Sequence, residues 1–204
     1  EVGLKAYGGL PSPWYSGMAS GHVLILSLAS FEITGDPSYL EYADYIFNGY
    51  QIGVSSGGFR VPTARGTLFE EYASPVRHLT RSPTVLNGHI FAMDGLYWYT
   101  QYQPDNEVAR ELLLSSLRFL NGNISKFSSH FWSFYDLYTL TYADLGYHSI
   151  HVKQLSKVLS LYKQSIEFDS SNIEYYQKKF DHARLLPFGF IERLIFQRNR
   201  MIVV

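Results

Sequence analysis

Apolar residues recur at helical spacing in three pairs of segments along the chain. The pairs are 18–31 with 38–50, 87–102 with 107–120, and a third that starts near His148 and returns to about Arg184. A polar turn separates the members of each pair, so the pattern predicts three antiparallel helical hairpins. Such hairpins cannot bury their apolar faces alone, and we expect them to pack side by side in an arc rather than a closed ring.

Two linkers between the predicted hairpins, 51–83 and 122–146, are longer than the usual helix connection of about 2–8 residues. The first contains strand-like pieces at 58–61 and 67–69 around turn residues, which predicts a short β-ribbon. Long ordered loops on a helical frame commonly carry function. The predicted fold class is therefore all-α with a small ribbon, in a single domain over 1–204.

Composition narrows the protein classes that remain. Hydrophobic residues make up 46% and charged residues 17% of the 204 residues, a globular balance. The net charge of −1 does not favour nucleic-acid binding, and the absence of cysteine excludes disulfides and Cys-ligated zinc. No uninterrupted apolar run reaches the roughly 18 residues of a membrane span, so no span is expected. The chain begins without Met, which is consistent with a processed or truncated piece.

Several well-known chemical motifs are missing from the sequence. It contains no Gly-rich phosphate loop, no G-x-S-x-G and no H-E-x-x-H. His148 and His151 are three residues apart at a predicted helix start and share a face. No carboxylate lies beside them at ligand spacing, and we therefore expect neither a metal nor a cofactor.

Polar and aromatic residues crowd together at three segment ends, 70–72, 134–137 and 146–151. A single aromatic residue ordinarily packs in a core. The chain, however, holds 17 Tyr residues, and each of these three stretches places Tyr beside an acid or a histidine. In a row of hairpins such ends converge on one rim, so the pattern indicates one polar site.

These stretches resemble the C-terminal domain of the D-glucuronyl C5-epimerase family, which acts on heparan sulfate precursors. The similar stretches are 14–21, 70–72, 85–88, 95–97, 135–137, 147–148, His151 and 154–155. The resemblance implies an (α/α) toroid, here an incomplete half-barrel, preceded in the family by β-rich domains. It also implies that Tyr72, Tyr135 and Tyr147 are catalytic, with Glu71 beside them.

The resemblance further implies a uronate-containing polysaccharide as substrate, in which D-glucuronate is converted to L-iduronate. We expect Trp14, Asn87 and His148, from the similar stretches, to bind it. After Tyr-Asp-Leu the family commonly has Arg, whereas this chain has Tyr138. Arg77 and Arg81 are the candidates to replace that cation, the alternative being that they are solvated loop charges.

The resemblance also has implications for the cellular compartment, and the predicted fold has implications for the oligomeric state. Animal members of the family work in the Golgi lumen, and a bacterial member would work in the cytoplasm or the cell envelope. An arc of hairpins with apolar edges favours association, either as a homo-oligomer or with missing N-terminal domains. No nucleic acid is expected as a partner.

Epimerisation at C5 requires one proton-transfer group on each face of the sugar ring, because a proton leaves one face and another arrives on the opposite one. Tyrosine, with a reference pKa of about 10, is a competent acid and, when ionised, a strong base. Tyr72 is the candidate for one face, and Tyr147 assisted by Tyr135 for the other. Glu71 is placed to donate to the substrate carboxylate or to orient a neighbouring side chain.

Three other interpretations stay open at this point. A polysaccharide lyase shares the abstraction of the C5 proton and then expels the group at C4. A glycoside hydrolase needs two acids, which Glu70 or Glu71 would supply together with Asp136 or Asp144. A helical-repeat scaffold that binds a glycan or a protein without catalysis is the third.

Overall fold

The computed structural model describes residues 10, 12–75, 83–185 and 191 of the 204-residue chain. The chain divides into two compact units, Glu1–Phe119 and Leu120–Val204, and each is described by itself. The described residues are mostly helical with a short two-stranded sheet, so the predicted all-α class with a small ribbon is confirmed. A single domain over 1–204 stays a prediction.

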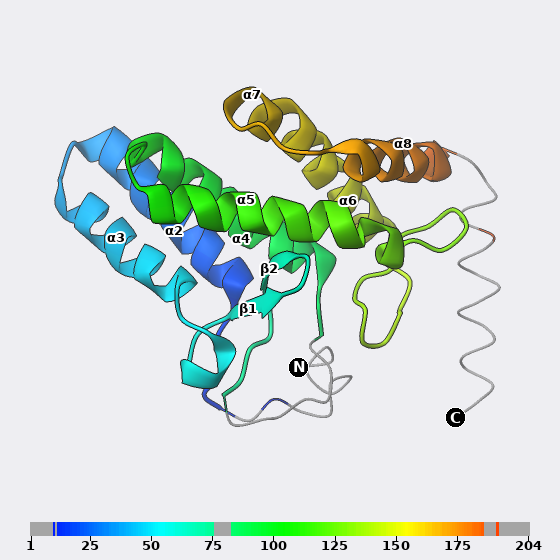
Figure 1. Ribbon diagram of the computed structural model, residues 1–204, viewed down its shortest axis with the longest axis horizontal. Helices are drawn as coiled ribbons and strands as arrows, with labels where there is room; N and C mark the ends of the chain where they lie inside the picture. Colours follow the sequence, from blue (N-terminus) through cyan, green and yellow to red (C-terminus); the bar gives the residue numbers. More distant parts are fainter. Residues whose placement is uncertain (1–9, 11, 76–82, 186–190, 192–204) are drawn as a thin grey trace. The chain divides into compact units, whose positions relative to one another are not determined.

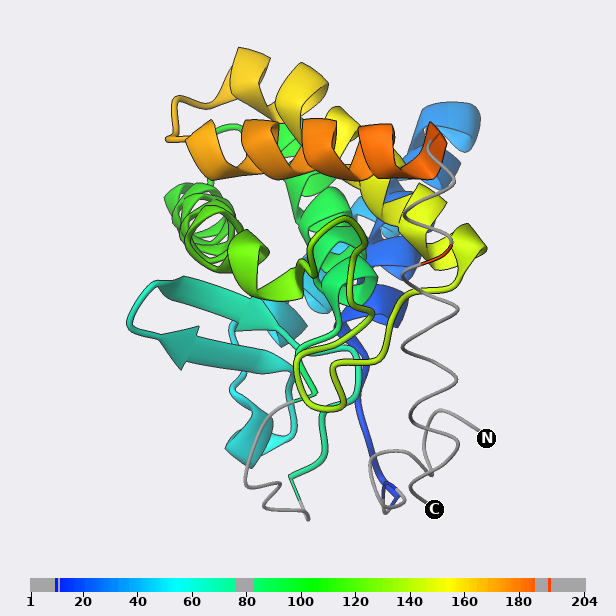
Figure 2. The same cartoon turned by 90° about the vertical axis from the view of Figure 1, so that its right-hand side faces the viewer.

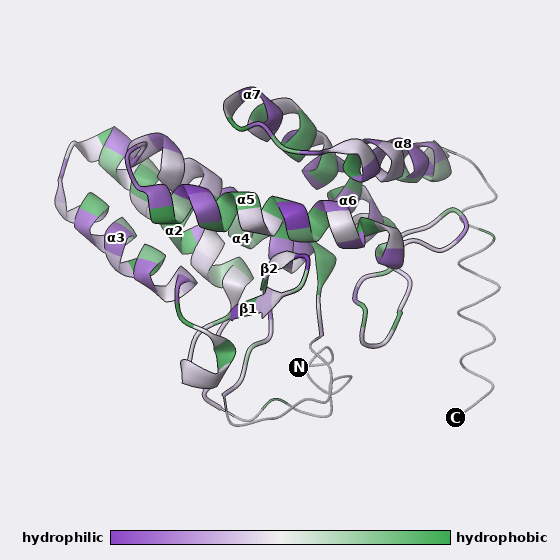
Figure 3. Cartoon of the chain, in the orientation of Figure 1, coloured by the Kyte–Doolittle hydropathy of each residue, from purple (hydrophilic) through white to green (hydrophobic). Residues whose placement is uncertain are grey.

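The first unit contains the first two predicted hairpins. Its helices are α2 (Gly17–Thr34), α3 (Ser38–Tyr50), α4 (Leu86–Tyr102) and α5 (Glu107–Asn123), the last of which ends beyond the unit boundary. Helix α2 contacts both α3 and α4 (Figure 1). Hydrophilic and hydrophobic residues alternate along α3 (Figure 3), and its buried face consists of Ala43, Phe47 and Tyr50. Helical periodicity therefore predicted these elements correctly.

Helices α2 and α4 approach each other closely through glycine. A Cβ atom at Gly21 would overlap the carbonyl oxygen of Phe91, and one at Gly95 would lie 2.6 Å from the Cα atom of Gly21. The Tyr50 hydroxyl of α3 donates a 2.9 Å hydrogen bond to the Ala92 carbonyl on the same stretch of α4. Close main-chain approach and a buried phenol thus join the three helices into one core.

A short ribbon follows α3, as expected for the first linker. Strand β1 (Arg60–Thr63) pairs antiparallel with β2 (Gly66–Phe69), as Figure 2 shows. Gly66 has a φ of 118°, which favours glycine. It packs against the main chain of Ser115 in α5, and a Cβ atom at Gly66 would overlap the Ser115 carbonyl oxygen. The ribbon is thereby fixed to α5, and the segment that leaves β2 begins from a defined point.

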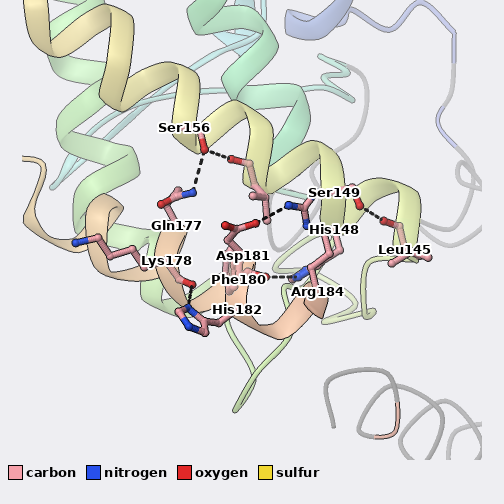
Figure 4. A network of polar contacts seen from close by, with 11 residues as sticks. Leu145, His148, Ser149, Ser156, Gln177, Lys178, Phe180, Asp181, His182 and Arg184 are labelled. Atoms are coloured by element: carbon pink, nitrogen blue, oxygen red, sulfur yellow. Dashed lines mark hydrogen bonds and ion pairs between the residues drawn. The ribbon is translucent and has the colours of Figure 1, made fainter. Parts of the chain in front are cut away.

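The second unit contains the third predicted hairpin. Its elements are η2 (Ile124–Phe127), α6 (Leu145–Lys157), η3 (Val158–Tyr162), α7 (Lys163–Ser165) and α8 (Ser171–Leu185). The Asp144 side chain caps α6 by accepting a 2.8 Å hydrogen bond from the Tyr147 amide. Helices α6 and α8 are joined by hydrogen bonds from His148 to Phe180 and between Ser156 and Gln177 (Figure 4).

Asn121 does not end α5, although the Asn-Gly pair predicts a stop there. The helix continues to Asn123. The Asn121 Oδ1 atom instead accepts hydrogen bonds from the amides of Asn172 and Ile173, at 3.1 and 3.2 Å. These amides lie in the first turn of α8, which has donors to satisfy, so a residue far away in sequence caps α8.

Helix α2 is long and apolar enough, by length and mean hydropathy alone, to be a candidate membrane span. Its 18 residues have a mean hydropathy of 1.2, and 28% of that window is buried. A helix that packs inside a folded unit meets the same two criteria. Gly21 contacts α4 closely and α2 also contacts α3, so one face of this helix packs within the first unit.

Candidate functional site

In the first unit the predicted site residues gather where β2 ends. Tyr15 and Ala73 pair across two main-chain hydrogen bonds of 2.7 and 2.9 Å. Their neighbours Trp14 and Tyr72 are thereby placed side by side, with ring centroids 5.8 Å apart and an angle of 44° between planes. Trp14 is 40% exposed, so this aromatic pair lies at the surface of the unit.

Glu71 is the buried acid beside this pair. It is 2% exposed, and burial raises the pKa of its carboxyl group, while a hydrogen bond with the Tyr72 side chain lowers it. Its Oε2 atom is buried and has no hydrogen-bond partner among the described residues. A Cβ atom at Gly88 would overlap this oxygen, so the absence of a side chain there makes room for the carboxyl group.

Asn87 lies next to Gly88 in the first turn of α4 and is 2% exposed. No side chain caps this helix at Val85. The amides of the first turn carry the positive end of the helix dipole, which favours a nearby anionic group. The predicted substrate residue Asn87 and the predicted acid Glu71 therefore belong to one cluster, since Gly88 contacts the acid.

The main chain that carries Glu71 and Tyr72 is held from three sides. The Gly17 amide donates a 2.8 Å hydrogen bond to the Glu70 carbonyl, and the Glu70 Oε1 atom accepts one of 3.0 Å from the Thr84 amide. The Nδ1 atom of His89 accepts a hydrogen bond from the Phe69 amide. Burial lowers the pKa of His89 to about 4, so the imidazole stays neutral. Rigid support of this kind fixes a reactive side chain in place.

In the second unit the other two predicted tyrosines are in contact. The rings of Tyr135 and Tyr147 meet edge to face, with centroids 4.8 Å apart and planes at 70°. Tyr147 is 39% exposed in the first turn of α6. Tyr135 lies in the preceding loop, where its amide donates to the Thr141 carbonyl. The structure therefore brings together two of the three candidate phenols.

The two aspartates that the hydrolase interpretation offers as alternatives both stabilise the backbone. Asp136 accepts hydrogen bonds from the amides of Tyr138 and Thr139 at 2.8 and 2.6 Å, and one from the Thr139 hydroxyl at 2.5 Å. Asp144 caps α6. Both carboxylates are therefore occupied by hydrogen bonds within the loop and the helix cap. These contacts weigh against the hydrolase.

His148, the predicted substrate-binding residue of α6, is fully buried. Its Nε2 atom lies 3.0 Å from the Phe180 carbonyl (Figure 4), so Nε2 carries the proton. Its Nδ1 atom accepts from the Ser133 hydroxyl at 2.8 Å. The same hydroxyl lies 2.8 Å from Nδ1 of His151. Because the Ser133 hydroxyl donates its proton to His148, it accepts a hydrogen bond from the Nδ1–H group of His151. The Nε2 atom of His151 is therefore unprotonated, and it is buried without a partner among the described residues.

Both imidazoles of this cluster are neutral. Burial is the main cause, and it lowers the pKa of His148 to about 4 and that of His151 to about 3. Trp132 stacks on His148 with ring centroids 3.8 Å apart. The cluster follows Tyr147 directly in the sequence, so it holds the first turn of α6 in place. Ser133 was not predicted as part of this cluster, because it lies 15 and 18 residues from the two histidines and no local pattern links them.

Some predicted residues are not placed by the structure. Arg77 and Arg81 lie outside the described residues. Among the residues that are described, no three His, Asp or Glu side chains gather in a way suited to a metal ion. Tyr72 with Glu71, and Tyr135 with Tyr147, belong to different units.

Most of the chain matches a known protein family, and two known proteins are similar to it. Residues 2–180 match the family model described as D-glucuronyl C5-epimerase C-terminus, a range that includes all three candidate tyrosines. The chain is 26% identical over 174 residues to a D-glucuronyl C5-epimerase of Caenorhabditis elegans, covering 77% of this chain and 27% of that protein. It is also 26% identical over 176 residues to an uncharacterised protein of Methanocaldococcus jannaschii, covering 83% of this chain and 52% of that protein.

Proposed function

Because the chain belongs to the D-glucuronyl C5-epimerase C-terminus family, we propose that it takes part in inverting C5 of a uronate residue within a polysaccharide. Membership supports an epimerase-like function at the family level. The chain spans about a quarter of the length of the Caenorhabditis elegans relative and about half of that of the Methanocaldococcus jannaschii relative. The activity of the whole protein is therefore part of the proposal. The observation that carries it is the buried acid Glu71, hydrogen-bonded to the phenol-bearing Tyr72 inside the matched region.

The reaction moves protons and no net electrons. A phenolate removes the proton from C5, and the electron pair of that C–H bond spreads onto the adjoining carboxylate as an enediolate. A phenol on the opposite face then donates a proton to C5, which restores the C–H bond with inverted configuration. The first tyrosine ends protonated and the second ionised, and proton exchange with water resets both. No redox cofactor is needed for this balance.

Glu71 suits the stabilisation of the enediolate. Because burial raises the pKa of its carboxyl group, the group keeps its proton to a higher pH than an exposed glutamate does. A protonated carboxyl donates a hydrogen bond to the substrate carboxylate, and this bond strengthens as negative charge develops there. Its Oε2 atom is buried and has no partner among the described residues, and it is the atom proposed to make that contact.

The tyrosines share the proton transfers in this proposal. Tyr72 serves one face of the sugar ring, and Tyr147, assisted by Tyr135, serves the other. The edge-to-face contact between Tyr135 and Tyr147 limits the motion of both rings. Since its ring nitrogens are used within the second unit, His148 is proposed as a positioning residue for Tyr147 rather than as a direct contact to sugar.

The proposed substrate is a uronate-containing polysaccharide, consistent with the name of the Caenorhabditis elegans relative, a D-glucuronyl C5-epimerase. Trp14 and Asn87 are proposed to contact it, because the first stacks near Tyr72 and the second precedes Gly88 beside the acid. The hydrolase needs acids that are otherwise engaged. The toroid architecture, a homo-oligomer and further N-terminal domains all remain predictions.

Exchange of the C5 hydrogen with solvent tests the proposal. A de-sulfated heparosan-type polymer is incubated with the protein in heavy water, and deuterium at C5 is measured by nuclear magnetic resonance. We expect Tyr72→Phe, Tyr135→Phe and Tyr147→Phe each to slow the exchange about a hundredfold or more. The control Tyr175→Phe, at an exposed position on α8, should exchange at the wild-type rate.

Four outcomes would contradict this assignment. Near-normal exchange in all three variants would remove the tyrosines from the mechanism. Ultraviolet-absorbing unsaturated ends would indicate a lyase, and new reducing ends would indicate a hydrolase. Polymer binding without exchange or cleavage would leave the non-catalytic glycan-binding module.

A further inference from the structure

Glu70, which no step of the proposed reaction uses, connects three segments of the first unit. Its main-chain amide donates a 2.9 Å hydrogen bond to the Phe59 carbonyl, just before β1, and its carbonyl accepts one of 2.8 Å from the Gly17 amide at the start of α2. Its side chain reaches the segment before α4, where the Oε1 atom accepts a 3.0 Å hydrogen bond from the Thr84 amide. Glu70 is 2% exposed, so these contacts are shielded from water.

Thr84 has an unusual backbone conformation. Its φ of 51° lies in the left-handed region, which a β-branched residue rarely adopts because its Cβ atom crowds the main chain. Strain of this kind persists only where the surrounding structure holds it. The Thr84 amide is also buried and needs an acceptor, which the Glu70 carboxyl group provides. The hydrogen bond therefore stabilises a conformation that threonine by itself disfavours.

The conformation of Thr84 sets the direction in which the chain enters α4. Val85 follows in an extended conformation, and no side chain caps the helix there. Residues 83–90 are all buried, so the helix start is enclosed by the first unit. Gly88, four residues after Thr84, is the position at which a Cβ atom would overlap the Glu71 carboxyl group. Two adjacent acids thus reach the start of α4, Glu70 through a hydrogen bond and Glu71 through packing.

We propose that Glu70 is a positioning residue for Glu71. By holding Thr84, it fixes the first turn of α4 at the place where Gly88 accommodates the Glu71 carboxyl group. The inference rests on the proposed function for what Glu71 does, whereas the clamp between Glu70 and Thr84 follows from their geometry. This role requires an oxygen atom at the right reach and no transfer of a proton, so Glu70 is not an acid of the reaction.

Two substitutions separate the reach of the Glu70 side chain from its acidity. Glu70→Gln keeps the length and an oxygen for the Thr84 amide, whereas Glu70→Asp keeps the acid but is one methylene shorter. We expect Glu70→Asp to lower kcat for deuterium exchange at C5 about tenfold or more while KM changes less than about twofold, and Glu70→Gln to restore most of the rate. The control Glu111→Asp, on α5 with its side chain 70% exposed, should match wild type. The reverse order, with Glu70→Asp active and Glu70→Gln inactive, would overturn the proposal in favour of an acid.

Thr84→Gly tests whether Glu70 acts through Thr84. Glycine adopts a φ of 51° without the strain of a β-branched residue, so the start of α4 then depends less on the clamp. The loss caused by Glu70→Asp should be at least about threefold smaller in the Thr84→Gly background than in wild type. An equal loss in both backgrounds would show that Glu70 does not act through Thr84.

Hydrogen exchange of the Thr84 amide, followed by nuclear magnetic resonance on the full chain, tests the clamp without turnover. We expect this amide to be protected in wild type and in Glu70→Gln, and to exchange at least about tenfold faster in Glu70→Asp. An unprotected amide in wild type would overturn the clamp and leave the proposed function intact. This comparison needs only wild type and Glu70→Gln, so it decides the matter even if Glu70→Asp does not fold. A protected amide with no exchange at C5 in wild type would remove the proposed function, and the positioning role with it.

Discussion

Gly88 decides where the acid of the first unit can lie. A methyl group at this position would overlap the Glu71 Oε2 atom and approach the Glu71 Cβ atom to 2.6 Å. Since Gly88 lies in the first turn of α4, its replacement by Ala displaces Glu71 rather than the helix. We expect Gly88→Ala to lower the exchange rate about tenfold to a hundredfold, because small misplacements of a catalytic group are costly.

The control for this prediction is the double variant Gly88→Ala with Glu71→Gln. If the glycine acts through the acid, the two losses should not multiply, and the double variant should resemble Glu71→Gln alone. Deuterium exchange gives the rates, and circular dichroism checks that the fold persists. Fully multiplicative losses would show that Gly88 acts on something other than Glu71.

In the second unit, Ser133 also acts through its neighbours, which are His148 and His151. Its hydroxyl lies between the Nδ1 atoms of His148 and His151 and donates to one while accepting from the other. Ser133→Ala leaves the buried Nδ1–H of His151 without an acceptor, which should cost about 1–3 kcal/mol in the free energy of unfolding. Urea unfolding measures this loss. Ser149→Ala, which removes only a solvent-exposed hydrogen bond within α6, should change stability little, and equal stability of both variants would refute the bridging role.

At the scale of elements, the contact between α2 and α4 depends on glycine. A Cβ atom at Gly21 would overlap the Phe91 carbonyl oxygen, which belongs to the main chain and cannot rotate away. Gly21→Ala should therefore destabilise the protein by about 1–3 kcal/mol through overpacking. Gly49→Ala in α3 is the matched control, because its nearest foreign atom would be 3.8 Å away and alanine favours the helix. Thermal unfolding should rank the two variants on opposite sides of wild type.

The same elements show what sequence can and cannot predict. Local periodicity and turn residues predicted α2, α3, α4 and the β-ribbon, because these features depend on neighbouring residues. Asn121 was expected to end a helix but caps α8, since its partners are about 50 residues away. Contacts of this range have no local signal.

The candidate site likewise combines residues that the sequence predicts with contacts that only the structure shows. A resemblance spread over several stretches predicted Glu71 and the three tyrosines as a set, and the contact between Tyr135 and Tyr147 is a finding of the structure. Burial was the property that sequence analysis missed. It makes His148 an internal residue whose ring nitrogens are occupied, although its place next to Tyr147 suggested a contact to the substrate.

Across the whole molecule, buried histidines should control the response to acid. His89 lies in the first unit, and His148 and His151 lie in the second. Burial lowers the pKa of the first two to about 4 and that of the third to about 3, whereas an unfolded histidine titrates near 6.5. Between these values the unfolded chain binds more protons than the folded one, so stability is fully present above about pH 6.5 and is lost as the pH falls.

The carboxyl group of Glu71 acts in the opposite direction, because its raised pKa makes the folded state bind a proton more readily. One such group does not offset three imidazoles. We therefore expect the free energy of unfolding, from urea titrations followed by circular dichroism, to fall by several kcal/mol between pH 7 and pH 5, at up to about 1.4 kcal/mol per pH unit for each histidine. His22→Asn, at an exposed position on α2, should leave this slope unchanged. Equal stability at the two pH values would mean that the three imidazoles are not buried in neutral form. It would also contradict the proposal that buried histidines hold Tyr72 and Tyr147 in position.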